Sequence, residues 1–180
     1  MKFLLISLIF FSPFSFAADL SHKQKSKILT EHNKVRAQYN VHNVYNLQWS
    51  DKLTSFAQEW ATYLSNDNNC TMRHRPRNGK YQQKYGENIF WSSPLTWSDG
   101  HTEVNKVKPK EVVKAWASEV EYYDYQSNTC QTGKMCGHYT QVIWHNSKYL
   151  GCAKAICPSK GQIWVCNYDP PGNYIGQKPY

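Results

Sequence analysis

The chain has 180 residues, a formal net charge of +8 and 41% hydrophobic residues. Its length suits one domain with a single core, and past the first residues no segment approaches the roughly 18 consecutive apolar residues of a membrane-spanning helix. The 21 lysines and arginines are scattered and accompany no recognition motif. We therefore expect no nucleic-acid partner and at most a weak contact with an anionic membrane surface.

Residues 1–17 predict a secretory signal peptide. One lysine precedes an apolar run from Phe3 to Phe11, and small residues follow at Ser15 and Ala17, after which cleavage is expected. We expect residues 18–180 to form a single domain that is exported and monomeric. It would be extracellular, or periplasmic if the source is a Gram-negative bacterium.

Three helices are expected in the first two thirds of the mature chain. Ser21 and Gln24 fit a capping box at the start of the first helix, and residues 50–65 carry a continuous apolar stripe typical of a second. Residues 66–108 form a polar section too long for an ordinary connection, and such segments often carry function. Pro109 then suits the first turn of a third helix.

The last third of the chain favours strands. Residues 151–157 and 162–168 are short, apolar and rich in β-branched residues, and "PSKG" separates them, which predicts a hairpin. Helices followed by paired strands favour an α+β fold, with helices packed on a small antiparallel sheet. The six cysteines all follow the signal peptide, and an even count in an exported chain favours three disulfides.

Glu119 is the first candidate site residue, because it falls inside the apolar stripe of the third predicted helix, between Trp116 and Tyr123; Val112 and Val120 complete the stripe. A buried carboxylate without a partner costs several kcal/mol, so Glu119 should meet a cation, a metal or hydrogen-bond donors. The alternative is that the stripe is narrow and Glu119 lies at its solvent-exposed edge.

Three more polar residues can accompany it: His74, Glu87 and His138. Two histidines and two glutamates suit a metal site or an acid-base site, although surface histidines explain the same pattern. The chain has neither H-E-x-x-H nor G-x-S-x-G, so a thermolysin-type zinc protease and a serine nucleophile elbow are unsupported.

Four segments, in order, resemble the CAP superfamily, which includes cysteine-rich secretory proteins and plant pathogenesis-related protein 1. They are "YGENIF", "KAWASEVEYYDY", "GHYTQVIWHNS" and "WVCNYDPPGNYIG". The resemblance covers essentially the whole mature chain and is greatest to the plant-type, single-domain form. It implies an α-β-α sandwich with a three-stranded antiparallel sheet between helices, and a short helix at "HYTQVIW".

The resemblance also assigns a cleft tetrad of His74, Glu87, Glu119 and His138. In family members the two histidines bind zinc or a similar divalent ion, and the acids lie nearby. Plant relatives usually have serine after the first histidine, whereas Arg75 follows it here and predicts a positive cleft rim. The family pattern pairs the cysteines as Cys70–Cys157, Cys130–Cys136 and Cys152–Cys166.

The function implied by the resemblance is binding of sterols or other lipids, with an antimicrobial or host-interaction role. Phe90, Trp91 and Trp97 would supply exposed apolar contact, unless they fill the core. One alternative is a metal-dependent hydrolase that uses the tetrad, although no catalytic residue is assigned. Another is that residues 170–180 are released as a signalling peptide, as their resemblance to a plant peptide suggests, rather than packing on the sheet as an ordered tail.

Overall fold

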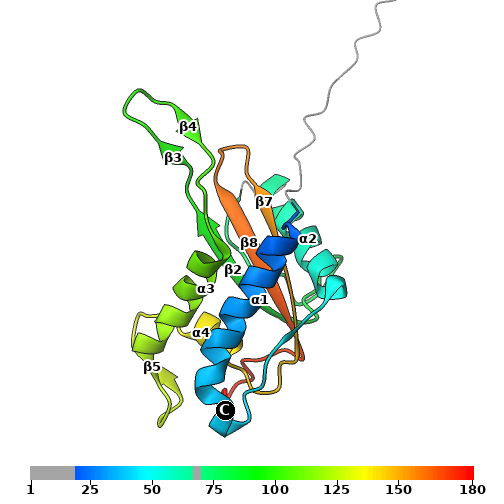
Figure 1. Cartoon of the computed structure of the whole chain (residues 1–180), viewed down its shortest axis with the longest axis vertical. Coiled ribbons are helices and arrows are strands. Elements are labelled where there is room, and N and C mark those ends of the chain that lie inside the picture. The colour runs from blue at the N-terminus through cyan, green and yellow to red at the C-terminus, as the bar shows by residue number, and fades with distance from the viewer. Residues whose placement is uncertain (1–18, 67–69) are drawn as a thin grey trace, which may run out of the picture.

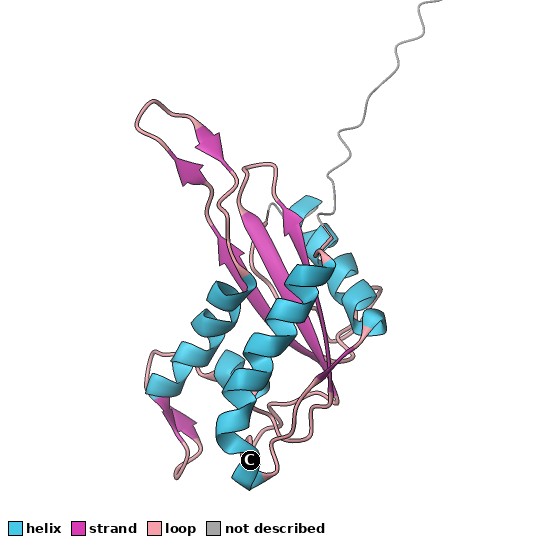
Figure 2. Cartoon of the chain, in the orientation of Figure 1, coloured by secondary structure: helices cyan, strands magenta, loops and turns pink. Residues whose placement is uncertain are grey.

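Helices cover both faces of a central sheet in this computed structural model (Figures 1 and 2). The structure describes residues 19–66 and 70–180, and the predicted signal peptide lies outside these ranges. The sheet has the strand order β1-β7-β8-β2. Within the described ranges no helix has the length and apolar character needed to cross a membrane. The predicted α+β sandwich is confirmed.

The long helices begin where the sequence predicts. α1 (His22–Arg36) starts after Ser21, whose hydroxyl accepts from Gln24 N at 3.3 Å while Gln24 Oε1 accepts from Ser21 N at 3.0 Å. α2 spans Asp51–Asn66. α3 (Pro109–Ala117) has proline in its first turn, where a missing N–H leaves no hydrogen bond unmade. A short 3₁₀ segment, η1 (Ala37–His42), follows α1.

Three antiparallel strands form the body of the sheet, as expected. β7 (Tyr149–Ile156) and β8 (Gln162–Asp169) make the predicted hairpin, and β2 (Gly86–Ser92) pairs with the other side of β8. A two-residue strand, β1 (Gln48–Trp49), adds a parallel edge to β7 that was not predicted. β2 forms the other edge of the sheet.

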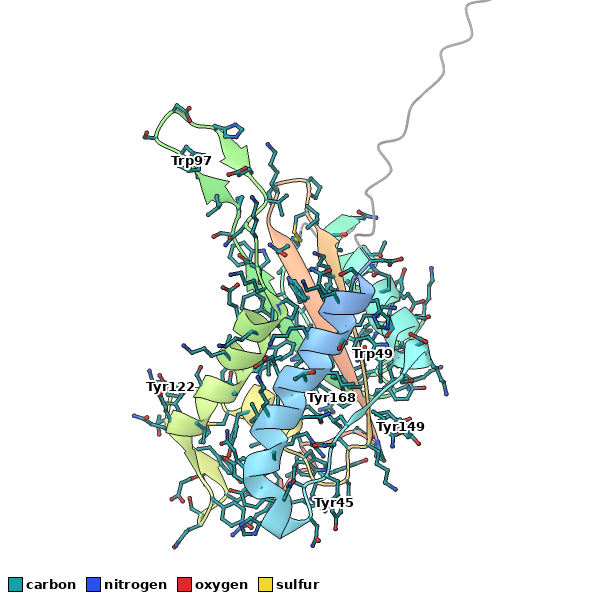
Figure 3. All side chains as sticks on the ribbon, viewed as in Figure 1. Tyr45, Trp49, Trp97, Tyr122, Tyr149 and Tyr168 are labelled. Carbon is teal, nitrogen blue, oxygen red and sulfur yellow. A yellow bond between two sulfur atoms is a disulfide. The ribbon has the colours of Figure 1, made fainter. Side chains whose placement is uncertain are left out.

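Side chains on the sheet alternate between two cores. Trp164, Cys166 and Tyr168 of β8 pack with α1, α3 and α4 (Gly137–Val142), whereas Ile163 and Val165 pack with α2. Tyr168 lies beside α1 in Figure 3. On the other face, a Cβ added to Gly151 would lie 2.2 Å from the backbone nitrogen of Thr54 in α2. Glycine therefore permits the close approach of α2 to β7.

The third predicted helix ends earlier than expected. α3 stops at Ala117 and continues as a 3₁₀ segment, η2 (Ser118–Tyr122), which leads to β5 (Tyr123–Asp124) and β6 (Thr129–Cys130). A 3₁₀ helix has three residues per turn, so the positions after Trp116 no longer follow the spacing of the α-helical stripe, although Tyr123 still packs against the main core. The prediction that Val120 belongs to the buried stripe is wrong, because Val120 is 43% exposed.

The three disulfides pair as the resemblance implied. Cys70–Cys157 joins the segment after α2 to the end of β7, and its Cα atoms lie 5.8 Å apart. Cys130–Cys136 closes a short loop before α4, and Cys152–Cys166 links the opposed positions of β7 and β8. No cysteine in the described part of the chain is free.

The C-terminal tail is ordered, but it packs on α4 and neighbouring loops rather than on the face of the sheet. Gly172 N donates to Gln141 of α4 at 3.0 Å, and His145 N donates to Pro179 O at 2.8 Å. The ring of Tyr180 stacks on that of Tyr125, with centroids 4.4 Å apart. These contacts agree with the expected ordered tail and correct its predicted location.

Candidate functional site

One histidine–glutamate pair lies where the loop after α2 meets the start of β2. His74 Nδ1 lies 2.8 Å from Glu87 Oε1, and the same oxygen accepts a hydrogen bond from Arg75 N at 3.1 Å. The Glu87 side chain is fully buried, whereas that of His74 is 56% exposed. The buried carboxylate thus holds an imidazole ring that remains accessible to ligands.

Arg75 points into the protein, so the predicted positive cleft rim is wrong at this residue. Its guanidinium carbon lies 3.7 Å from the centre of the Phe56 ring, and Nη2 donates to Phe56 O and to Glu59 Oε2. Nη1 donates to Tyr81 O. Nε lies 3.9 Å from Glu87 Oε2, so the cation offsets the buried charge of Glu87.

The second pair joins η2 to the start of α4. Glu119 Oε1 lies 2.6 Å from His138 Nδ1, and Oε2 accepts from the backbone N–H groups of His138 at 2.9 Å and Tyr139 at 3.2 Å. The Glu119 side chain is only 13% exposed. The expectation that this carboxylate meets hydrogen-bond donors is confirmed, and the donors include N–H groups that a helix start leaves unpaired.

Asn88, the residue after Glu87 on the edge strand β2, connects the second pair to this strand. Glu87 and Asn88 are consecutive residues of this strand and point to opposite faces. Asn88 Nδ2 donates to His138 O at 3.0 Å and to Tyr168 Oη at 3.1 Å, on the face that carries α1 and α3. Within residues 19–66 and 70–180, no hydrogen bond, ion pair or ring contact joins one pair to the other.

Each His–Glu pair has the carboxylate–imidazole arrangement found around metal-binding histidines. Each ring directs Nδ1 at a carboxylate, an arrangement that orients a metal-binding histidine and leaves Nε2 for the metal. Both oxygens of Glu119 already accept hydrogen bonds, and Glu87 Oε2 is buried without a hydrogen-bond partner. Among the described residues, no group of three or more His, Cys, Asp or Glu side chains could hold a metal ion.

A buried chain of hydrogen bonds behind His138 was not predicted. His32 in α1 is fully buried; Nδ1 donates to Ile28 O at 2.8 Å, and Nε2 accepts from Tyr168 Oη at 2.9 Å. Burial lowers the pKa of His32 to about 4 and raises that of Tyr168. The sequence gives no signal for this contact, because Tyr168 lies 136 residues after His32.

A groove lies at the opposite end of the sheet from the His–Glu pairs, between the first turns of α1 and residues 104–110. Its volume is about 1190 Å³. Val104, Val107 and Pro109 give it apolar walls. Six lysines also line it: Lys23, Lys27, Lys106, Lys108, Lys110 and Lys154. The alternation of valine or proline with lysine in "VNKVKPK" was the available sequence signal.

The aromatic residues expected to supply apolar contact divide into two groups. Trp91 and Trp97 are exposed, with Trp97 55% accessible, as the lipid-contact interpretation requires. Phe90 instead packs against the main core, so its expected exposure is wrong. Alternation along β2 explains the difference, because Phe90 and Trp91 point to opposite faces.

Comparisons with known proteins give consistent similarities. The model of the cysteine-rich secretory protein family, CAP, matches residues 29–168. Pathogenesis-related protein PR-1 of Medicago truncatula is 42% identical over 161 residues, which are 89% of this chain and 81% of that protein. Pathogenesis-related protein 1A of Nicotiana tabacum is 38% identical over 180 residues, covering 99% of this chain and 94% of that protein. The solved structure of BmVAL-1 has a TM-score of 0.69 at 26% identity, over 95% of this chain and 86% of that one.

Proposed function

The chain belongs to the cysteine-rich secretory protein family, CAP, and on this basis we propose that it is an exported defence or host-interaction protein that binds a sterol or another lipid. The names of its plant relatives motivate the defence role. Three disulfides and the predicted signal peptide support export to the extracellular space.

The groove beside α1 is the observation that supports lipid binding. Ligand sites for small molecules commonly have volumes of about 300–1,000 Å³ and largely apolar walls, so a groove of about 1190 Å³ is large enough for a sterol. Valine and proline side chains and the alkyl stems of the lysines would contact the lipid body, and the ammonium groups would lie near its polar end.

A sterol-binding titration of the oxidised mature protein tests this proposal. Val104→Asp places a charge in the groove wall, and Val120→Asp is a matched control, since both valines are exposed and Val120 lies outside the groove. We expect saturable binding that Val104→Asp weakens at least roughly tenfold. Absence of saturable binding, or equal loss in both variants, would exclude the groove as the sterol site.

We further propose that His74 and His138 bind a divalent metal through Nε2, with zinc as the first candidate. Two protein ligands leave the remaining positions to solvent or to a ligand, and a bound zinc would supply Lewis acidity there. The chain's own contribution is orientation, because Glu87 and Glu119 fix the two rings through Nδ1.

Calorimetric titration with zinc tests the metal proposal. His74→Ala and His138→Ala should each weaken zinc binding, whereas His101→Ala, on an exposed turn, should not. Retention of wild-type affinity in both site variants would contradict the proposal.

The metal and lipid sites should act independently. Ser92, at the end of β2, pairs with Gln162 of the groove, whereas Glu87 pairs with Asn167. Ser92 and Glu87 lie five residues apart along the strand, which is a distance of about 16 Å. A chelator should therefore leave sterol binding in the groove unchanged. A metal-dependent hydrolase stays a weaker alternative, and substrate turnover abolished by chelator would favour it.

A further inference from the structure

A two-stranded hairpin projects from the domain between β2 and α3 (Figure 1). β3 (Leu95–Thr96) pairs with β4 (Thr102–Glu103), and the turn between them is closed by local hydrogen bonds. Trp97 N donates to His101 O at 2.8 Å, and Asp99 Oδ1 accepts from His101 N at 2.8 Å. These bonds define the conformation of the tip.

The hairpin exposes large apolar side chains to solvent. Trp97 lies on the projecting part, away from the body of the domain (Figure 3), and Leu95, two residues earlier in β3, is also exposed. Trp91 and Val104 are exposed at its base. Burial of such side chains is energetically favourable. Their concentration at one end of the molecule therefore indicates a surface that binds a partner.

Positive charge surrounds the foot of this hairpin. The six lysines of the groove lie there, and Lys160 of the β7–β8 turn donates to Thr102 O of β4 at 2.5 Å. The segments that carry these lysines contain fewer carboxylates: Asp19, Glu31, Asp99, Glu103 and Glu111. Glu31 pairs with Lys27 at 2.7 Å, and Glu111 accepts from the backbone N–H of Lys108.

We propose that this end of the molecule is a docking surface for anionic lipid bilayers. Trp97 and Leu95 enter the interfacial region of the bilayer, where tryptophan is favoured. The lysines, which lie farther from the tip of the hairpin, contact the acidic lipid headgroups. A bilayer suits a narrow projecting tip, because lipid molecules move apart to accommodate inserted side chains. A stable protein partner would need a complementary surface of roughly 1,000 Å² or more. The proposal does not depend on sterol binding in the groove.

Co-sedimentation with sterol-free vesicles tests the docking surface. The vesicles contain phosphatidylcholine alone or mixed with phosphatidylglycerol. We expect the intact protein to bind the mixed vesicles more tightly, with affinity falling as salt rises. Trp97→Ala should lower the partition coefficient roughly tenfold, and Lys106→Gln/Lys110→Gln should lower it more than tenfold at low ionic strength.

Matched controls separate the hairpin from general surface effects. Tyr45→Ala removes an exposed aromatic ring at the other end of the molecule, and Lys34→Gln/Lys84→Gln removes two charges outside the groove. Both should bind like wild type. Equal losses in the hairpin and control variants, or no preference for anionic vesicles, would overturn the proposal.

Two further measurements distinguish a loss of docking from unfolding and from a change in self-association. Circular dichroism of each variant checks the fold, and sedimentation without vesicles checks self-association. If Trp97→Ala converts a dimer to a monomer and leaves vesicle binding intact, the surface joins two copies of the chain and the docking proposal is wrong. A Trp97→Ala protein that loses vesicle binding but binds sterol normally would support docking as a function separate from the groove.

Discussion

Glu119 binds both the ring and the backbone of His138: Oε1 lies 2.6 Å from Nδ1, and Oε2 lies 2.9 Å from the backbone nitrogen. One carboxylate therefore fixes the orientation of the imidazole and anchors the first turn of α4 to η2. With its oxygens engaged in this way, Glu119 is a positioning residue for His138.

Glu119→Gln should loosen this anchor. The amide has one acceptor oxygen in place of two. If its NH₂ group faces the backbone N–H groups of His138 and Tyr139, two donors meet and no hydrogen bond forms. We expect a loss of about 1–3 kcal/mol in the free energy of unfolding and a roughly 10- to 100-fold loss of zinc affinity. Urea unfolding and calorimetry measure the two effects. Glu121→Gln, two residues away and exposed, is the control, and equal behaviour of the two variants would contradict the role of Glu119.

Arg75→Ala should destabilise the protein strongly. The guanidinium is buried on Phe56 and lies near the buried carboxylate of Glu87, so its removal leaves an uncompensated charge. We expect a loss of about 3–5 kcal/mol in the free energy of unfolding. Arg77→Ala, at an exposed position of the same loop, should cost no more than about 0.5 kcal/mol.

A second substitution tests the cause of that loss. If the cost arises from the buried charge, Glu87→Gln in the Arg75→Ala background should recover part of the lost stability. No recovery would show that the cost comes from lost packing and hydrogen bonds of the guanidinium instead.

Stability should fall in acid because of His32, whose pKa is about 4 in the folded protein. Above a pH of about 6.5 the ring is neutral in both folded and unfolded chains. Between about 6.5 and 4 only the unfolded chain takes up the proton, so the free energy of unfolding decreases by roughly 3 kcal/mol in total. Below that interval both states are protonated and the contribution is constant.

His32→Gln removes this titration and should flatten the dependence of the unfolding free energy on pH over the same interval, even though the variant is less stable at neutral pH. Urea unfolding at several pH values measures the slope. The exposed His22→Gln should retain the wild-type slope. An unchanged slope in His32→Gln would refute the assignment to His32.

The disulfides should differ in their contribution to stability. Cys70–Cys157 closes 87 residues and Cys130–Cys136 closes 6. In the chain-entropy model, removing the first costs about 4.6 kcal/mol and removing the second about 2 kcal/mol. Paired Cys→Ser variants, compared by thermal and urea unfolding under oxidising conditions, test this order. A greater loss for the Cys130–Cys136 variant would show that native contacts around His138 outweigh loop entropy.

The sequence by itself determined the features that depend on near neighbours. The capping box of Ser21 and Gln24, the start of α3 at Pro109 and the β7–β8 hairpin follow from local hydrogen bonding, the ring of proline and strand alternation. Resemblance to the CAP family then supplied the disulfide pairs, and the structure contains them. Glu119 was identified by its position on a helix, although the segment that carries it is 3₁₀.

Tertiary structure alone decided where several side chains point. Arg75 is polar and lies in a loop, yet it is buried, because Phe56, Glu59 and Tyr81 surround it after the chain has folded. Each His–Glu pair joins two separate segments of the chain, and the groove exists only where α1 and residues 104–110 meet. Each of these features depends on contacts between separate segments of the chain, and a local sequence pattern does not specify which segments meet.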